Sequence, residues 1–205
     1  MGERRCAIAF TSNRIETRSH ILETALSLLE EQRGHGVRMT DIAKRANLSR
    51  QAIYLHFDSR AELMSAATSF LDEKLDLDRR LAPSRTAKTG FTRLKSYIHF
   101  WGYYIPEIYG VAKALLLIQD TDQAAAAAWN GRMLALRDGC EAVIEMLHSE
   151  GRLIDELDKD GAIDFLWTLL SISNWENLTI ECGWSTQEYI DRLTLMAERT
   201  LVKDH

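Results

Sequence analysis

The sequence predicts an all-α protein of about nine helices, with a small N-terminal helix-turn-helix domain followed by a larger helical domain. Three observations predict this class. The 205 residues include only two prolines and eleven glycines, too few turn residues for a many-stranded sandwich. With 46% apolar and 27% charged residues, the chain has the composition of a folded protein rather than a disordered one. Apolar residues recur at helical spacing behind capping signals along most of the chain.

The first predicted helix begins at the capping box of Asn13 and Glu16, after a polar tail over residues 1–12 that we expect to be flexible. Its apolar stripe consists of Ile15, Leu22, Ala25, Leu26 and Leu29. Thr40 can cap a short second helix, and Ser49 can cap a third that runs through Phe57. Two short helices joined by a tight turn and braced by a longer one form a helix-turn-helix unit.

A second capping box, Ser59 to Glu62, begins a connecting helix that should end near Pro83. Further helices are expected at about 88–104, 106–119, 121–150, 161–182 and 185–203. The predicted organisation is therefore a tail over 1–12, a helix-turn-helix domain over 13–58, and a connecting helix with a larger domain over 59–205.

Charge and cysteine content limit the classes of function. Residues 1–60 hold ten Lys and Arg against seven Asp and Glu, whereas residues 61–205 hold fifteen against twenty-three, so only the N-terminal part suits a polyanion. Cys6, Cys140 and Cys182 lie far apart, in no metal-binding or disulfide pattern. The sequence contains no run of about 18 apolar residues, and it matches no catalytic motif. We expect a cytoplasmic protein that has no metal, cofactor or membrane partner and is not an enzyme.

Residues 40–57, with the sequence TDIAKRANLSRQAIYLHF, followed by Arg60 and Leu63, closely resemble the DNA-binding domain of TetR-family transcriptional regulators. The resemblance covers about residues 14–64 and implies a recognition helix that enters the major groove. On that helix, Arg50 can bind guanine, Gln51 can bind adenine, and Ala52 can contact a thymine methyl group. These three residues are the candidates for base contact. The alternative for Arg50 is contact with phosphate alone.

The resemblance also implies contacts with the DNA backbone, made by side chains that can donate to phosphate oxygens. The candidates are Thr40, Ser49, Tyr54, His56 and Arg60, with Lys44 as a further one. Each has an ordinary structural alternative: Thr40 and Ser49 are also helix caps, and the others can serve local hydrogen bonds or solvation. Asn47 and Gln51 replace residues that are small or glycine in the commonest family pattern, so the family's operator sequences should not be transferred.

In the larger domain the resemblance is one of architecture, and it implies dimerisation and a small ligand. Residues 91–109 contain seven aromatic residues, more than one amphipathic stripe needs, so some should line a cavity for a hydrophobic or aromatic effector rather than pack in the core. The candidates for that pocket are Trp101, Tyr104, Tyr109, Trp129, Met133, Asn174, Trp175 and Asn177.

The last two predicted helices carry apolar residues on more than one face, which predicts a partner for the second face. The resemblance implies that this partner is a second copy of the chain. The candidate interface residues are Phe165, Leu169, Ile172, Tyr189, Leu193 and Met196. A homodimer places two recognition helices about a twofold axis, so we expect an inverted repeat in double-stranded DNA.

The resemblance thus implies a repressor that leaves a palindromic operator when a small hydrophobic ligand binds. One alternative is a DNA-binding regulator or architectural protein without small-molecule control, acting as an activator or a global regulator. Another is an enzyme that uses the acidic helical domain, for which the sequence offers no motif.

Overall fold

The computed structural model describes residues 2–32 and 36–203, with side chains from residue 13 onward. This part of the chain folds into ten α-helices and one π-helical turn, and its only β feature is an isolated bridge between Leu153 and Val202. The predicted all-α class is confirmed. The chain forms two compact units: unit 1 comprises Met1–Leu75 with Gly110–Gly131, and unit 2 comprises Asp76–Tyr109 with Arg132–His205.

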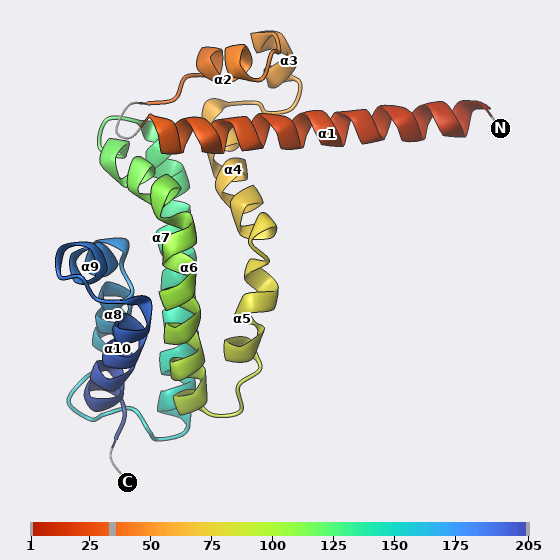
Figure 1. Ribbon diagram of the computed structural model, residues 1–205. Coiled ribbons are helices and arrows are strands. Elements are labelled where there is room, and N and C mark those ends of the chain that lie inside the picture. Colours follow the sequence, from red (N-terminus) through yellow and green to blue (C-terminus); the bar gives the residue numbers. More distant parts are fainter. Residues whose placement is uncertain (1, 33–35, 204–205) are drawn as a thin grey trace. The chain divides into compact units, whose positions relative to one another are not determined.

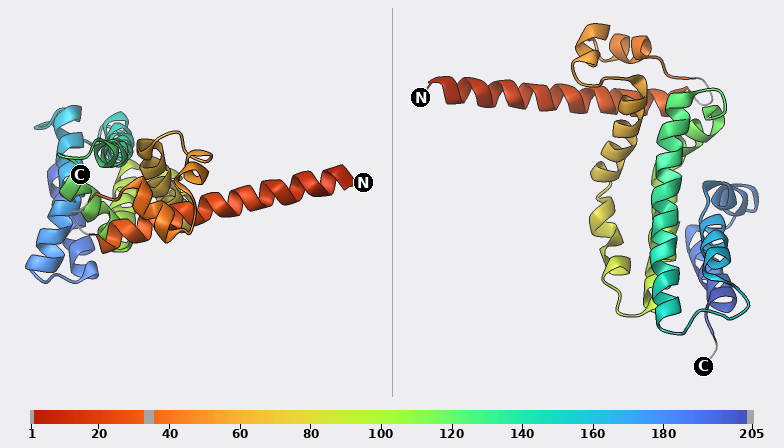
Figure 2. Two further views of the ribbon diagram at one scale, coloured as in Figure 1. Left: turned by 90° about the horizontal axis from the view of Figure 1, so that it is seen from above. Right: turned by 180° about the vertical axis from the view of Figure 1, so that it is seen from behind.

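Unit 1 begins with a long helix and the two short helices of the predicted motif. Helix α1 spans Gly2–Glu31, α2 Met39–Arg45, α3 Arg50–Tyr54 and α4 Arg60–Lys74. In Figure 1 and Figure 2, α2 and α3 lie together on one side of α1, and α4 begins beside it. The unit is completed by the end of α6 (Gly90–Ile118) and the start of α7 (Gln123–Ser149).

Helix α1 begins at Gly2 rather than at the predicted capping box near Asn13. No proline or further glycine follows Gly2 before that box, so the sequence holds nothing that stops the helix from extending backwards. The predicted apolar stripe of α1 is buried from Ile21 onward, but Ile15 is exposed.

The helix-turn-helix core is formed by apolar residues of α2, of α3 and of the segments that follow them. Ile42, Ala43, Ala46, Ile53 and Phe57 are all buried, and Leu48 is half-buried. Asn47 adopts a left-handed conformation with a φ angle of 56°, which joins α2 to α3 without a glycine. The short helices therefore have a fixed relative orientation.

Unit 2 contains α5 (Leu77–Arg85), the first part of α6, the second part of α7 and three later helices. These are α8 (Lys159–Leu169), α9 (Ile172–Glu176), which continues into the π-helical turn η1 (Asn177–Glu181), and α10 (Thr186–Leu201). The helix predicted over 161–182 is therefore interrupted. The Oγ atom of Ser171 accepts a hydrogen bond from the backbone N–H of Asn174 at 3.2 Å and so caps a new helix there.

Two other helix boundaries differ from the prediction. The helices expected at 88–104 and 106–119 form the single helix α6, in which Pro106 is exposed. A proline within a helix removes one backbone hydrogen bond, and α6 continues through Pro106 despite this loss. The connecting helix expected from Ser59 is divided into α4 and α5 at Asp76, whose φ angle is 54°.

The core of unit 2 is closely packed around α6. Gly102 lies against α10 so closely that a Cβ atom there would stand 2.3 Å from Cγ1 of Ile190. Tyr97 is buried, and its hydroxyl donates to the carbonyl oxygen of Leu136 at 3.0 Å. Burial raises the pKa of the Cys140 thiol to about 12, which makes it an inert core group. None of the helices in the described residues is long and apolar enough to cross a membrane.

Candidate nucleic-acid interface

Helix α3 is capped at its start, and its inner face is buried. The Oγ atom of Ser49 accepts a hydrogen bond from the backbone N–H of Ala52 at 3.0 Å, which caps the helix start. Ile53 and Phe57 are buried beneath the helix and anchor its inner face. Arg50 and Gln51 therefore remain exposed, and Ala52 is half-buried.

Arg50 is not an isolated side chain. Its guanidinium group lies 5.5 Å from the centre of the Tyr54 ring, and Nη2 donates to the Tyr54 hydroxyl at 3.3 Å. Both residues line a groove of about 710 Å³ that also includes Arg38 and Thr40. Donor groups of α2, α3 and the segment before α2 thus converge at one place, which suits an anionic ligand.

Of the other predicted backbone-contact residues, Arg60 lines this groove, whereas Lys44, Ser49 and His56 do not. Lys44 and Ser49 are exposed, although Ser49 already serves as the cap of α3. His56 is half-buried, and burial, helped by the charges of Arg14 and Arg18 on α1, lowers its pKa. Its ring is therefore neutral at pH 7 and can donate one hydrogen bond.

Arg60 is placed differently from the exposed candidates. Its Nε atom donates to the carbonyl oxygen of Val37 at 2.6 Å, and its two terminal nitrogens each donate to a carboxylate oxygen of Asp122 at 2.6 Å. Asp122 in turn caps α7 by accepting from the backbone N–H groups of Ala124 and Ala125. These contacts assign Arg60 a bridging position between the segment before α2 and the α6–α7 turn.

The partner of Arg60 could not be predicted from local sequence signals, because Asp122 lies 62 residues further along the chain. The sequence analysis also missed Arg38, which lines the groove, and Leu55, whose side chain is 75% exposed. Arg45, by contrast, forms a two-pronged ion pair with Glu31 at 2.8 and 2.9 Å, which occupies its guanidinium group on the surface.

The eight predicted pocket residues do not line the groove beside α3 or the two grooves of unit 2 that are lined by Lys95 and by Phe91. Tyr104 is a core residue at 1% exposure and packs against the Trp101 ring at 5.7 Å. The side-chain N–H of Asn174 donates to the Leu169 carbonyl oxygen and stabilises the helix break, whereas Asn177 is exposed. Trp129 is buried in unit 1 and Met133 is half-buried in unit 2.

Tyr109 and Trp175 do come together. Their ring centres are 5.0 Å apart, and the Tyr109 hydroxyl donates to Oε1 of Glu176 at 2.6 Å. Trp175 is only 8% exposed, and its Nε1 has no hydrogen-bond partner among the residues that the structure describes. A buried N–H group without a partner is a free donor at this position.

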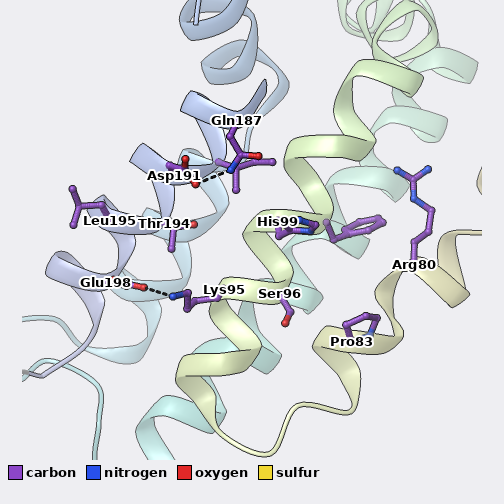
Figure 3. Close-up of a pocket in the computed structure, with 12 residues that line it drawn as sticks. Arg80, Pro83, Lys95, Ser96, His99, Gln187, Asp191, Thr194, Leu195 and Glu198 are labelled. Carbon is purple, nitrogen blue, oxygen red and sulfur yellow. Dashed lines mark hydrogen bonds and ion pairs between the residues drawn. The ribbon is translucent and has the colours of Figure 1, made fainter. Parts of the chain in front are cut away.

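A groove of about 620 Å³ lies in unit 2 between α5, α6 and α10. Figure 3 shows its walls, where Asp191 accepts a hydrogen bond from Gln187 at 2.8 Å and Lys95 pairs with Glu198 at 3.5 Å. Arg80 pairs with Glu107, so the charges of these walls are largely neutralised within the protein. This groove is more polar than the aromatic pocket predicted from the sequence.

Half of the predicted interface residues are buried within one copy of the chain. Ile172, Tyr189 and Leu193 are at most 5% exposed, so their side chains already belong to the core of unit 2 and cannot form a free surface. Phe165 and Leu169 are half-buried, and Met196 is 46% exposed. Both faces of these helices are apolar, so spacing alone does not distinguish buried from exposed apolar residues.

The fold and the N-terminal geometry define a helix-turn-helix protein with an exposed recognition helix. Residues 21–67 match the sequence profile of the family described as "Bacterial regulatory proteins, tetR family". This match begins within α1 and ends within α4, so it covers the helix-turn-helix. The chain is also similar to the HTH-type transcriptional regulator AcrR from Shigella flexneri, with 44% identity over 50 residues. That match spans 24% of this chain and only 23% of AcrR.

Solved structures extend the likeness to the whole fold. A transcriptional regulator from Saccharomonospora viridis in complex with choline has a TM-score of 0.71 and 23% identity, over 92% of this chain and 99% of that one. NalD, the secondary repressor of the MexAB-OprM multidrug efflux pump in Pseudomonas aeruginosa, has a TM-score of 0.65 and 19% identity, over 94% and 100% of the two chains. At these identities the comparison establishes the fold.

Proposed function

We propose that this chain is a sequence-specific DNA-binding transcriptional regulator, a repressor that binds an inverted repeat as a homodimer and is released by a small hydrophobic or aromatic ligand. It would act where the DNA of a bacterial cell lies, in the cytoplasm. The observation that carries the proposal is the exposed polar face of α3 above a buried helix-turn-helix core. A short helix presented in this way fits the major groove of B-DNA.

The surroundings of α3 support contact with the DNA backbone. Thr40, Lys44 and Tyr54 are exposed donors, and Arg38 and Arg50 add positive charge beside them. We propose that these groups bind phosphate and that Gln51 and Ala52 contact bases. Arg60 would act indirectly, by holding the segment before α2 in place.

A homodimer is supported by apolar side chains that remain exposed in unit 2. Ile180, Leu195 and Met196 are 51%, 46% and 46% exposed, and Phe165 and Leu169 are half-buried on α8. We propose that these residues, in place of the buried ones predicted from the sequence, contact a second copy of the chain. Twofold symmetry then requires an inverted repeat in the DNA.

Control by an effector is supported by the pair of Tyr109 and Trp175. An apolar ligand with one hydrogen-bond acceptor would satisfy the free Nε1 of Trp175 and pack against both rings. Helices α6 and α7 are shared between the two units, and their segment Gly110–Gly131 belongs to unit 1. We propose that a ligand shifts this segment, which the Arg60–Asp122 ion pair links to the helix-turn-helix.

Selection of bound fragments from random duplex DNA by the full chain tests the proposal. We expect an inverted repeat whose half-sites are centred about 34 to 36 Å, or a multiple of that distance, apart. The chain should prefer this sequence over random duplex by roughly 10³ to 10⁷. Retention of all sequences alike would favour an architectural protein, and unchanged affinity with every hydrophobic compound tested would remove effector control from the proposal.

A further inference from the structure

Leu55 is the most exposed large apolar side chain in the described residues, at 75%, and it lies at the end of α3. A single exposed leucine is common on protein surfaces and carries no argument by itself. This one, however, follows Tyr54 and precedes His56 in the chain, so it lies among the residues expected to contact DNA.

The exposed face of α3 consists of two rows of side chains. Residues four apart on a helix lie on the same face, so Arg50 and Tyr54 form one row and Gln51 and Leu55 form the other. The helical hydrogen bonding continues to Leu55, whose backbone N–H donates to the Gln51 carbonyl oxygen at 3.2 Å. Leu55 therefore lies one turn beyond Gln51.

The first row is organised for an anion. Arg50 is stacked on Tyr54 and donates to its hydroxyl, and both residues line the groove that includes Arg38 and Thr40. A guanidinium group, a phenol and a threonine hydroxyl together form a set of donors that matches phosphate oxygens. This arrangement favours contact of Arg50 with a phosphate group over contact with guanine.

The second row has a different chemistry. Gln51 is exposed, and its amide forms no hydrogen bond with another residue that the structure describes. Its amide matches N6 and N7 of adenine, whereas the branched apolar end of Leu55 can contact only an apolar group of the major groove. The 5-methyl group of thymine is that group.

We infer that Leu55 is a specificity-determining residue, which contacts the methyl group of a thymine next to the base pair bound by Gln51. The inference rests on the proposed function and adds to it the composition of the half-site: two neighbouring A·T pairs opposite Gln51 and Leu55. Arg50 and Tyr54 hold the adjoining phosphate.

The test uses the full chain and the duplex selected from random DNA. Each thymine of the half-site is replaced in turn by deoxyuridine, in both half-sites at once, because this change removes only the methyl group. Binding is measured by fluorescence anisotropy for the natural chain and for Leu55→Ala. One methyl group is worth about 0.8 kcal/mol, or about fourfold per half-site, so one position should weaken binding by about fifteenfold in the natural chain. At the same position Leu55→Ala should show almost no effect.

Three further variants are the controls. Leu134→Ala removes another exposed leucine, 61% exposed on α7, and should leave the deoxyuridine effect unchanged. Gln51→Ala should change preference at the neighbouring base pair and keep the deoxyuridine effect. Arg50→Ala should weaken all sequences alike. Thermal unfolding of Leu55→Ala should match that of the natural chain, since the side chain is exposed.

The outcomes separate the inference from the proposed function. A chain that selects a sequence but shows no deoxyuridine effect, or shows the same effect in Leu55→Ala, overturns the inference alone. A loss of preference at one G·C pair in Arg50→Ala would also overturn it, because Arg50 would then contact a base. A chain that selects no sequence overturns the proposed function and the inference with it.

Discussion

Replacing Phe57 with alanine is expected to lower the free energy of unfolding of unit 1 by about 3 to 5 kcal/mol and to abolish specific DNA binding. Phe57 is 1% exposed and closes the core beneath α3. The Arg18 guanidinium group lies 4.9 Å from its ring centre, so the variant loses that contact too. Hydrogen exchange of the backbone amides in α2 and α3, compared with those of α10, measures the loss where it occurs.

Phe91→Ala is the matched control for this prediction. Phe91 belongs to unit 2 and is 36% exposed, so its removal should leave exchange in α2 and α3 unchanged. If Phe57→Ala also left hydrogen exchange in α2 and α3 unchanged, the Phe57 ring would not be what stabilises the recognition helix.

Breaking the Arg60–Asp122 ion pair is expected to have the second largest effect. Asp122→Ala removes a two-pronged ion pair whose side chains are 25% and 13% exposed, together with the cap of α7. We expect a loss of about 2 kcal/mol in the free energy of unfolding of unit 1. We also expect weaker DNA binding. Without Asp122, the Arg60 side chain is no longer fixed, so its hydrogen bond to the Val37 carbonyl oxygen in the segment before α2 is weakened. Chemical denaturation and binding to the selected duplex measure the two effects.

Asp122→Asn separates the ion pair from the cap, since asparagine caps helices about as well as aspartate. The hydrogen bonds from Arg60 lower the pKa of Asp122 in the folded chain. A lowered carboxyl pKa stabilises the fold above the ordinary carboxyl range, and this contribution is lost as the pH falls through the lowered pKa. The natural chain should therefore be more stable than Asp122→Asn at pH 7, and the difference should shrink toward zero in acid.

The exposed pair of Glu31 and Arg45 is the control for the ion-pair effect. It has the same two-pronged geometry, and hydrogen bonds from Arg45 and Ser27 lower the pKa of Glu31 to about 2, but both side chains are 49% exposed. Glu31→Gln should thus change stability little. A difference between natural chain and Asp122→Asn that stayed constant down to low pH would show that the charge of Asp122 is not its source.

The helix-turn-helix could be predicted from the sequence because its determinants are local. Ser49 caps α3, Asn47 supplies the left-handed turn, and Ile42, Ile53 and Phe57 recur at helical spacing. Each of these signals acts over a few residues, so it can be recognised in the sequence without the tertiary structure.

Other features depend on contacts between distant residues. Arginine is a typical phosphate-binding residue, so the sequence alone favours that role for Arg60. Only the fold brings Asp122 into contact with it. Tyr189, Leu193 and Met196 are all large apolar residues of α10. Tyr189 and Leu193 are buried and Met196 is exposed, and this difference arises only from tertiary packing. The division of the connecting helix at Asp76 likewise has no sequence signal as strong as a proline or glycine.

We propose that the exposed face of α3 contacts DNA. The most direct measurement is the affinity of the selected duplex for the Gln51→Ala/Tyr54→Ala double variant, with the Leu134→Ala chain as control. Because Gln51 and Tyr54 are exposed, the double variant should unfold at the same temperature as the natural chain. We expect its affinity to fall more than about a hundredfold, since a lost base contact is worth about 1 to 3 kcal/mol in each half-site. Affinity equal to that of the natural chain, with the same dependence on salt, would contradict the account.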